Sequence, residues 1–165
     1  MKTINKFRLK HLFKTMLAFI LVLAFNVVQG QNSDTDQKAI VWETDDSTLK
    51  WGPCPGFMPE DCRIAVLQGN PKKPNTDVFF KMQGNTTVPR HWHNSPERMV
   101  LVSGKMRVNY DGQDSEIINT GDYAYGPAER PHEATCLSDE PCILFIAFED
   151  PIDAMPMSKT EDSKK

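Results

Sequence analysis

The chain has 165 residues, enough for one compact domain and too few for two of ordinary size. Its formal net charge is -3, but residues 1–30 carry 5 of the 19 Lys and Arg and none of the 22 Asp and Glu. Without that segment, 14 basic residues face 22 acidic ones, a net charge of -8, which argues against nucleic acid and anionic membranes as partners.

Residues 1–30 have the layout of a targeting segment. The basic stretch MKTINKFRLKHLFKT precedes the apolar run MLAFILVLAFNVV, and small residues follow at Val28 and Gly30. The apolar run is shorter than the roughly 20 residues of a membrane-spanning helix. We therefore predict a signal peptide, export to the periplasm or the exterior, and no stable membrane span after cleavage. An uncleaved N-terminal anchor is the alternative.

The segments that flank the central part of the chain are polar. Residues 31–50 are acid-rich apart from AIVW, residues 39–42, and we interpret them as a flexible lead-in in which AIVW could add one edge strand. Residues 151–165 contain Pro and Met followed by SKTEDSKK, which predicts a frayed, charged C-terminal tail.

Short apolar runs separated by turn residues fill the region between these segments. They are RIAVLQ, TDVFFKM, TVPRHWH, ERMVLVS, KMRVNY, SEIIN, YAY, HEATC and CILFIAF. Several alternate as half-buried strands do, with Val78, Phe80 and Met82 on one face of their strand. Gly104 lies between two runs, and the Asp111-Gly112 pair indicates a two-residue hairpin turn. The pattern predicts an all-β sandwich or barrel.

Four cysteines occur as two close pairs, in a chain that we expect to be exported. Local pairing, Cys54 with Cys62 and Cys136 with Cys142, is our prediction among the three possible connectivities. Each disulfide would close a short loop and contribute roughly 2 to 3 kcal/mol. The spacings suit such loop staples better than they suit tetrahedral metal ligation.

The stretch RHWHNSPERMV groups residues that could bind a metal. On a strand, His91 and His93 project from the same face, so a single ion could contact both imidazoles. The turn formers at 94–96 should reverse the chain, so that Glu97 opens the neighbouring strand close to the histidines. His132, at the start of HEATC, would have to be brought to them by the fold. A set of polar residues on a surface turn is the alternative.

These residues carry a resemblance to a known family. HWHNSPE followed by Gly104 matches the first cupin signature, and GDYAYGPAERPH resembles the second. The similarity extends from about residue 64 to residue 148 and resembles small single-domain cupins. Three positions depart from the usual pattern: Gly84 lies one residue further from His91, Glu129 replaces a Gly, and Cys136 replaces an Asn. None of them is a ligand position.

The resemblance implies a fold, a cofactor and a ligand set. The fold is a cupin-type antiparallel β-barrel (jelly roll) over residues 51–150. The cofactor is one divalent transition metal, bound by His91, His93, Glu97 and His132, with one or two positions left for water or substrate. Three imidazoles and a carboxylate do not distinguish between Fe, Mn, Ni, Cu and Zn.

Further residues are candidates for the cavity and for catalysis. Parity along the strands favours Phe80, Met82 and Met99 as cavity-facing residues, although ordinary core packing would also explain them. Near His132 in the sequence, Glu129, Tyr123 and Tyr125 could donate or accept a proton; solvent exposure at the end of a strand is the simpler interpretation.

The leading functional hypothesis is an exported metal-dependent enzyme that acts on a small molecule, with dioxygenase-like chemistry as the first choice. A non-catalytic metal-dependent module that binds or senses a small ligand is the alternative, and a purely structural metal is a third interpretation. The apolar outer face of ERMVLVS, with Val100 and Val102, needs a cover. Either the N-terminal segment or a second subunit could supply it, and we predict a homodimer.

Overall fold

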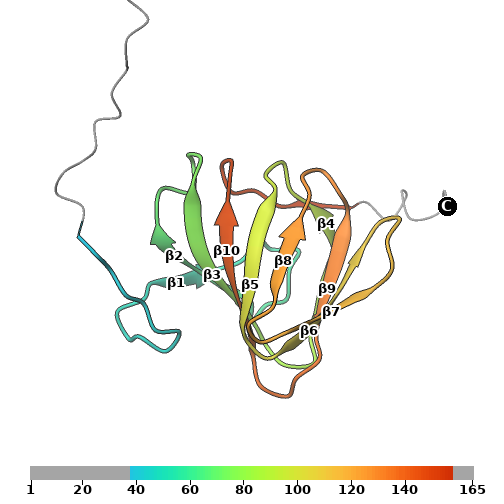
Figure 1. Ribbon diagram of the computed structural model, residues 1–165, viewed down its shortest axis with the longest axis horizontal. Helices are drawn as coiled ribbons and strands as arrows, with labels where there is room; N and C mark the ends of the chain where they lie inside the picture. Colours follow the sequence, from blue (N-terminus) through green and yellow to red (C-terminus); the bar gives the residue numbers. More distant parts are fainter. Residues whose placement is uncertain (1–37, 158–165) are drawn as a thin grey trace, which may run out of the picture. The chain divides into compact units, whose positions relative to one another are not determined.

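Residues 38–157 are described by the computed structural model, and all regular structure in that range is β-strand (Figure 1). The strands are β1 Trp51–Pro53, β2 Arg63–Gln68, β3 Thr76–Met82, β4 Thr87–Trp92, β5 Glu97–Ser103, β6 Lys105–Tyr110, β7 Glu116–Asn119, β8 Tyr123–Gly126, β9 His132–Cys136, β10 Cys142–Phe148 and β11 Met155–Pro156. The predicted signal peptide lies outside the described residues. Residues 38–157 include no helix of the length and apolarity that a membrane span requires.

The strands form two antiparallel sheets. One has the order β1-β2-β3-β10-β5-β8, and the other has the order β11-β4-β9-β6-β7. Sequence-distant strands therefore lie side by side, as β10 does between β3 and β5 (Figure 1). The predicted all-β, antiparallel jelly-roll barrel is confirmed.

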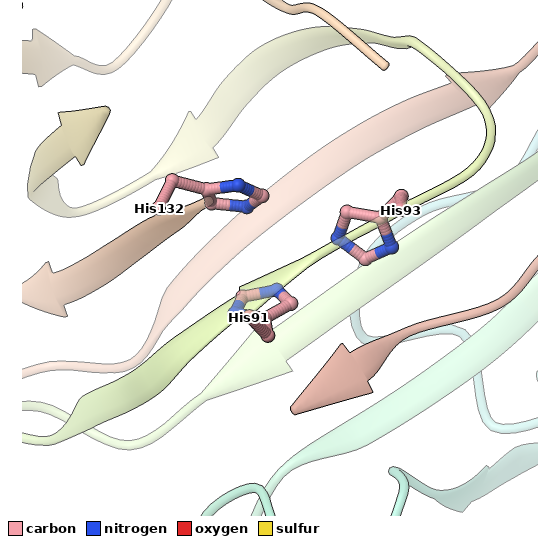
Figure 2. A group of neighbouring side chains, drawn as sticks. All are labelled: His91, His93 and His132. Carbon is pink, nitrogen blue, oxygen red and sulfur yellow. The ribbon is translucent and has the colours of Figure 1, made fainter. Parts of the chain in front are cut away.

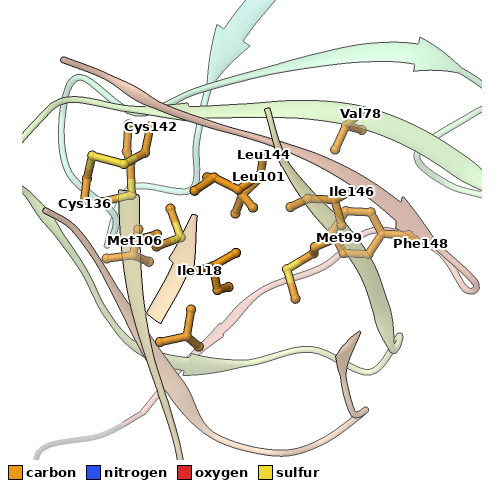
Figure 3. Close-up of a cluster of buried hydrophobic side chains, with 13 residues drawn as sticks. Val78, Met99, Leu101, Met106, Ile118, Cys136, Cys142, Leu144, Ile146 and Phe148 are labelled. Atoms are coloured by element: carbon orange, nitrogen blue, oxygen red, sulfur yellow. A yellow bond between two sulfur atoms is a disulfide. The ribbon is translucent and has the colours of Figure 1, made fainter. Parts of the chain in front are cut away.

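The main core lies between the sheets. Along β5 the buried residues alternate with more exposed ones, so Glu97, Met99 and Leu101 point inward while Arg98 points to solvent. Strands β3, β4, β5, β6, β7, β9 and β10 each place at least one buried side chain in this core, and β2 and β8 add the partly buried Ile64 and Ala124. Figure 3 shows this cluster, which includes Val78, Met99, Leu101, Met106, Ile118, Cys136, Cys142, Leu144, Ile146 and Phe148.

A second apolar cluster covers the outer face of the six-stranded sheet. Phe79 points outward from β3 and packs with Leu49, Trp51 and Val102. The predicted cover over ERMVLVS is thus supplied, at Val102, by the N-terminal part of the same chain. The expected edge strand at residues 39–42 is wrong, because Trp42 instead packs on this cluster and its indole Nε1 donates to the Leu67 carbonyl at 3.2 Å.

The turn at Gly104 is tight, whereas the connection at Asp111-Gly112 is a longer loop. Gly104 adopts φ +91° where the chain passes from β5 in one sheet to β6 in the other, and an added Cβ would lie 2.8 Å from the Cys142 Sγ. A side chain there would be strained. The expected two-residue hairpin at Asp111-Gly112 is wrong, because residues 111–115 all lie between β6 and β7. The Asp111 N–H donates to the Pro131 carbonyl at 2.9 Å. The backbone at Asp111 therefore still bonds to the segment before β9 and does not form a tight turn.

The start of the predicted tail is also corrected. Residues 151–157 are not frayed, because β11 pairs with β4 at the edge of the five-stranded sheet. The Ile152 N–H donates to the Pro71 carbonyl at 2.9 Å, and the Met157 N–H donates to the Arg90 carbonyl at 3.1 Å. Residues 158–165 lie outside the described range.

Both predicted disulfides are present, in the local pairing. Cys54 joins Cys62 with a Cα–Cα distance of 5.5 Å, and Cys136 joins Cys142 with a Cα–Cα distance of 5.7 Å. These separations are ordinary for a disulfide. The first closes the loop between β1 and β2, and the second links β9 to β10 and so connects the two sheets.

Candidate metal centre

Three buried histidines lie together inside the barrel (Figure 2). His91 lies near the end of β4, and His132, the first residue of β9, is its register partner across the ladder. His93 follows the end of β4 on the same inward face, while Trp92 between them is less buried. Each histidine offers one ligand atom, and these atoms lie within 4.8 Å of one another.

Glu97 reaches this group from the opposite sheet. The expectation that Glu97 opens a strand next to β4 is wrong, because β5 belongs to the six-stranded sheet and β4 pairs with β9 and β11. The turn at 94–96 therefore carries the chain across the barrel. The Glu97 Oε1 lies 3.5 Å from the His93 Nε2, and its Oε2 lies 3.8 Å from the His132 Nε2.

The turn before Glu97 is fixed by contacts with the C-terminal segment. The Ser95 hydroxyl is buried and accepts hydrogen bonds from the backbone N–H groups of Glu149 and Asp150, both at 3.0 Å. Asn94 donates to the Asp153 carboxylate through its backbone N–H and its amide. These bonds hold the start of β5, and with it Glu97, against the end of β10.

Each imidazole is oriented by a backbone carbonyl. The Nδ1 of His91 contacts the Pro89 carbonyl at 2.8 Å, and the Nδ1 of His132 contacts the Arg130 carbonyl at 3.1 Å. The Nδ1 of His93 contacts the carbonyl of Asp153. Because a carbonyl only accepts, each Nδ1 carries the proton and each Nε2 keeps its lone pair. Metal-binding histidines in general are oriented in this way, by a hydrogen bond from the ring nitrogen that does not face the metal.

Burial favours the uncharged form of His91 and of His132. Desolvation, followed by repulsion from His132 and His93, lowers the pKa of His91 to about 3. Desolvation also lowers the pKa of His132, although the negative charge of Glu97 opposes that shift. Neutral imidazoles at ordinary pH are the form that binds a metal.

Tyr110 is a neighbour of the site that the sequence did not single out. It is the register partner of His132, and the two rings are 4.7 Å apart. Burial, and then the charge of Glu97, raises the pKa of Tyr110 well above its usual range. A Cβ at Gly126 would lie 2.5 Å from the Tyr110 Oη and 3.1 Å from the Glu97 Oε2, so the bare backbone there leaves room for both groups.

The three predicted proton-transfer candidates do not face the histidines. Tyr123 and Tyr125 are 64% and 53% exposed, because β8 turns Ala124 and Gly126 inward instead. The side chain of Glu129 is exposed as well. Its backbone still contributes to the site, since the Glu129 N–H donates to the His93 carbonyl at 2.7 Å.

A cavity of about 160 Å³ adjoins the three histidines and Glu97. Phe80 and Met99 line it, whereas Met82 is fully buried in the main core and is not part of the wall. The loop closed by Cys54 and Cys62 contributes Pro55 and Met58 to the wall. The position of that loop was not foreseen, because its residues carry no pattern that relates them to the histidines.

The donor set fits a divalent transition metal. Three imidazoles present ligand atoms within 4.8 Å of one another, and a buried carboxylate lies beside two of them. Imidazole nitrogens suit Zn, Cu, Fe and Ni, and a carboxylate also suits Mn. The three histidines could therefore hold one metal ion, with Glu97 in place as a further donor.

Comparisons with known proteins agree on the fold. Residues 78–148 match the family model described as Cupin domain. A chain from the crystal structures of the DMSP lyases RdDddP and RnDddQII is similar with a TM-score of 0.59 and 15% identity over 67% of this chain and 63% of that one. This chain thus spans less than two thirds of the length of that protein.

Two more solved structures have the same fold. DMSP lyase DddQ from Ruegeria pomeroyi has a TM-score of 0.57 and 14% identity, covering 70% of this chain and 64% of that one. Oxalate decarboxylase from Lactobacillus farciminis, in a formate complex, has a TM-score of 0.55 and 20% identity, covering 71% of this chain and 36% of that one. No curated protein sequence matches. Identities this low establish a shared fold and leave the activity to be argued from the site.

Proposed function

We propose, from the match of residues 78–148 to the Cupin domain and from the site, that the protein is an exported metal-dependent enzyme acting on a small molecule. One divalent transition metal ion is held by His91, His93, Glu97 and His132. The first choice of chemistry is dioxygenase-like. Fe, Mn, Ni, Cu and Zn all remain compatible with this ligand set.

The observation that carries the proposal is the orientation of the three imidazoles. Each Nδ1 is occupied by a backbone carbonyl, so the only free nitrogen of each ring is the Nε2. Two of these nitrogens lie beside the Glu97 carboxylate. Histidines that only fill space in a core would not need all three Nε2 atoms to be directed toward one another by carbonyl contacts at Nδ1.

The cavity favours a functional ion over a purely structural one. A structural metal has a closed ligand set, whereas a catalytic metal keeps a position open for water or substrate. Here the ligands border a space of about 160 Å³. When bound, the ion would supply Lewis acidity at that open position. The protonated Tyr110 hydroxyl, near the Glu97 carboxylate, would supply a hydrogen-bond donor at the edge of the ligand set.

A non-catalytic module that binds or senses a small ligand through the metal is the second candidate. It is favoured by the composition of the cavity wall. Beyond the four proposed ligands, Asp153 is the one titratable residue among the wall residues that the structure describes, and its carboxylate accepts hydrogen bonds from Asn94. An enzyme of this design would rely on the ion and its ligands for proton transfer.

Export is supported by the chemistry of the cysteines. All four are paired in disulfides, which persist in oxidising compartments and are rare in the cytosol. The predicted signal peptide is consistent with this location. The predicted homodimer remains a proposal. The N-terminal part of the same chain already covers Val102, so a second subunit is not needed to bury that side chain.

Metal content tests the proposal directly. The full-length protein, purified without chelators, should contain about one equivalent of a transition metal by elemental analysis. Glu97→Gln should weaken binding and His93→Ala should abolish it, because each removes a donor. Glu133→Gln is the matched control, since Glu133 lies next to His132 on β9 but its carboxylate accepts from the Asn109 amide. Unchanged metal content in His93→Ala would contradict the proposal.

A turnover assay then separates the two candidates. An enzyme loses reaction rate in His93→Ala, whereas a binding module loses ligand affinity and has no rate to lose.

A further inference from the structure

The wall of the cavity is chemically divided. Its polar side chains lie at one end, where His91, His93, Glu97 and His132 meet and where Asp153, whose carbonyl contacts the His93 Nδ1, adds a second carboxylate. The remaining wall is almost entirely apolar, with residues such as Phe80, Met106 and Leu144. Among the wall residues that the structure describes there is no Lys or Arg.

This division restricts what the cavity can bind. A second charged or strongly polar group on a ligand would be buried against apolar side chains without a partner, which is unfavourable. A group at the other end would meet the ion and its ligands. A divalent ion and the Glu97 carboxylate together carry a net charge of +1, and the nearby Asp153 carboxylate lowers it further, so an oxygen group with at most one negative charge suits that end.

From this division we infer that the ligand is a small molecule with one metal-binding oxygen group at one end and an uncharged apolar body. The inference rests on the proposed function for the metal-binding end and on the wall alone for the apolar end. It disfavours dicarboxylates, phosphorylated compounds and free sugars, because each would place a further charged or polar group against the apolar wall.

The volume limits the size of the apolar body. A cavity of about 150 Å³ lined by Leu, Ile and Phe is known to bind benzene, and the cavity here measures about 160 Å³. A six-membered ring or a chain of four or five carbons therefore fills it. Met58, Met99 and Met106 line the space, and their flexible side chains allow some variation in the shape of that body.

Two acids of equal chain length provide the test. Pentanoate and glutarate both offer a carboxylate to the metal, but the far end is a methyl group in the first and a second carboxylate in the second. Each is titrated into the cobalt(II)-loaded full-length protein, and the visible cobalt bands report binding. We expect pentanoate to bind at least about tenfold more tightly, because its body is apolar. Equal affinities, tighter binding of glutarate, or no binding of either acid would overturn the inference.

A charge placed in the wall should reverse the preference. Phe80→Lys puts an ammonium group at a half-buried wall position on β3, and glutarate should then bind at least as tightly as pentanoate. Val66→Lys is the matched control, because Val66 lies on the neighbouring strand β2 but is 41% exposed and outside the wall. If Phe80→Lys does not fold, the comparison of the two acids on the wild-type protein still decides the question.

Failure of the inference is distinguishable from failure of the proposed function. If the protein takes up no cobalt, the proposed metal site is wrong, and the apolar end is tested separately by toluene on the metal-free protein. Toluene should then raise the melting temperature, and Phe80→Lys should remove that shift. If cobalt binds and the two acids do not differ, the metal site holds and the apolar-body inference is wrong.

Discussion

The two disulfides have similar spacing in the sequence and lie in different physical settings. Cys54 and Cys62 close a loop between β1 and β2 of one sheet, and that loop contributes to the cavity wall. Cys136 and Cys142 connect the two sheets and are both fully buried in the main core. His132 and Cys136 begin and end β9, so this second disulfide lies at the far end of the strand from the histidine.

The first disulfide belongs to the part of the barrel that shapes the site, and the second belongs to the part that holds the two sheets together. In the first loop the Phe57 ring lies 5.8 Å from the His91 ring. Around the second disulfide the contacts are structural, since Leu137 donates to the Lys105 carbonyl at 2.7 Å and Gly104 is held against Cys142. Site and scaffold should therefore respond differently to the loss of one bridge.

Removal of the inter-sheet disulfide should have the largest effect. The double variant Cys136→Ala, Cys142→Ala loses both the loop constraint and buried sulfur atoms in the core, so the free energy of unfolding should fall by about 4 kcal/mol. Urea unfolding followed by tryptophan fluorescence measures this change. A loss smaller than that of the Cys54, Cys62 double variant would break the comparison.

Removal of the loop disulfide should have a smaller effect on stability and a larger one on binding. Cys54→Ala, Cys62→Ala should lower the free energy of unfolding by about 2 kcal/mol, because Cys54 is only half-buried, part of the loop is exposed, and no cavity opens in the main core. Metal content should be retained, since no proposed ligand lies in the loop. Pentanoate affinity should fall, because Pro55 and Met58 are no longer held in the wall. Isothermal titration calorimetry provides the measurement, with the other double variant as its control.

Acidification should act on the histidine end alone. The pKa of His91 falls from 6.5 to about 3 on folding, so the unfolded chain binds a proton more readily, and stability decreases as pH drops below 6.5 toward 3. For the metal-free protein the loss between pH 6.5 and pH 5.5 should be about 1 kcal/mol. Urea unfolding at several pH values measures it, and His91→Gln should flatten the dependence. An unchanged slope in that variant would place the titrating group elsewhere.

Local patterns predicted the features that depend on near neighbours in the chain. The period of two placed His91 and His93 on one face, and the close spacing of Cys54 and Cys62 predicted their pairing. The apolar runs marked the strands because each has to bury one face.

Features that depend on which strands pair with each other could not be predicted from the sequence. Glu97 was expected beside β4 and instead crosses from the other sheet, because the turn at 94–96 could serve either geometry. Tyr110 and Asp153 reach the site through the pairing of β6 with β9 and of β11 with β4. Neither residue carries a local signal, since each is specified only by contacts distant in sequence.

The bond between the His93 Nδ1 and the Asp153 carbonyl has a consequence for the order of events during synthesis. The four proposed ligands have all left the ribosome once residue 132 has emerged, but the carbonyl that orients His93 comes from a segment made later. A nascent chain that stops short of Asp153 would contain all four proposed metal ligands. Its His93 imidazole would lack the carbonyl that fixes its orientation. Tight metal binding should therefore require a chain that extends past Asp153, close to the final strand β11.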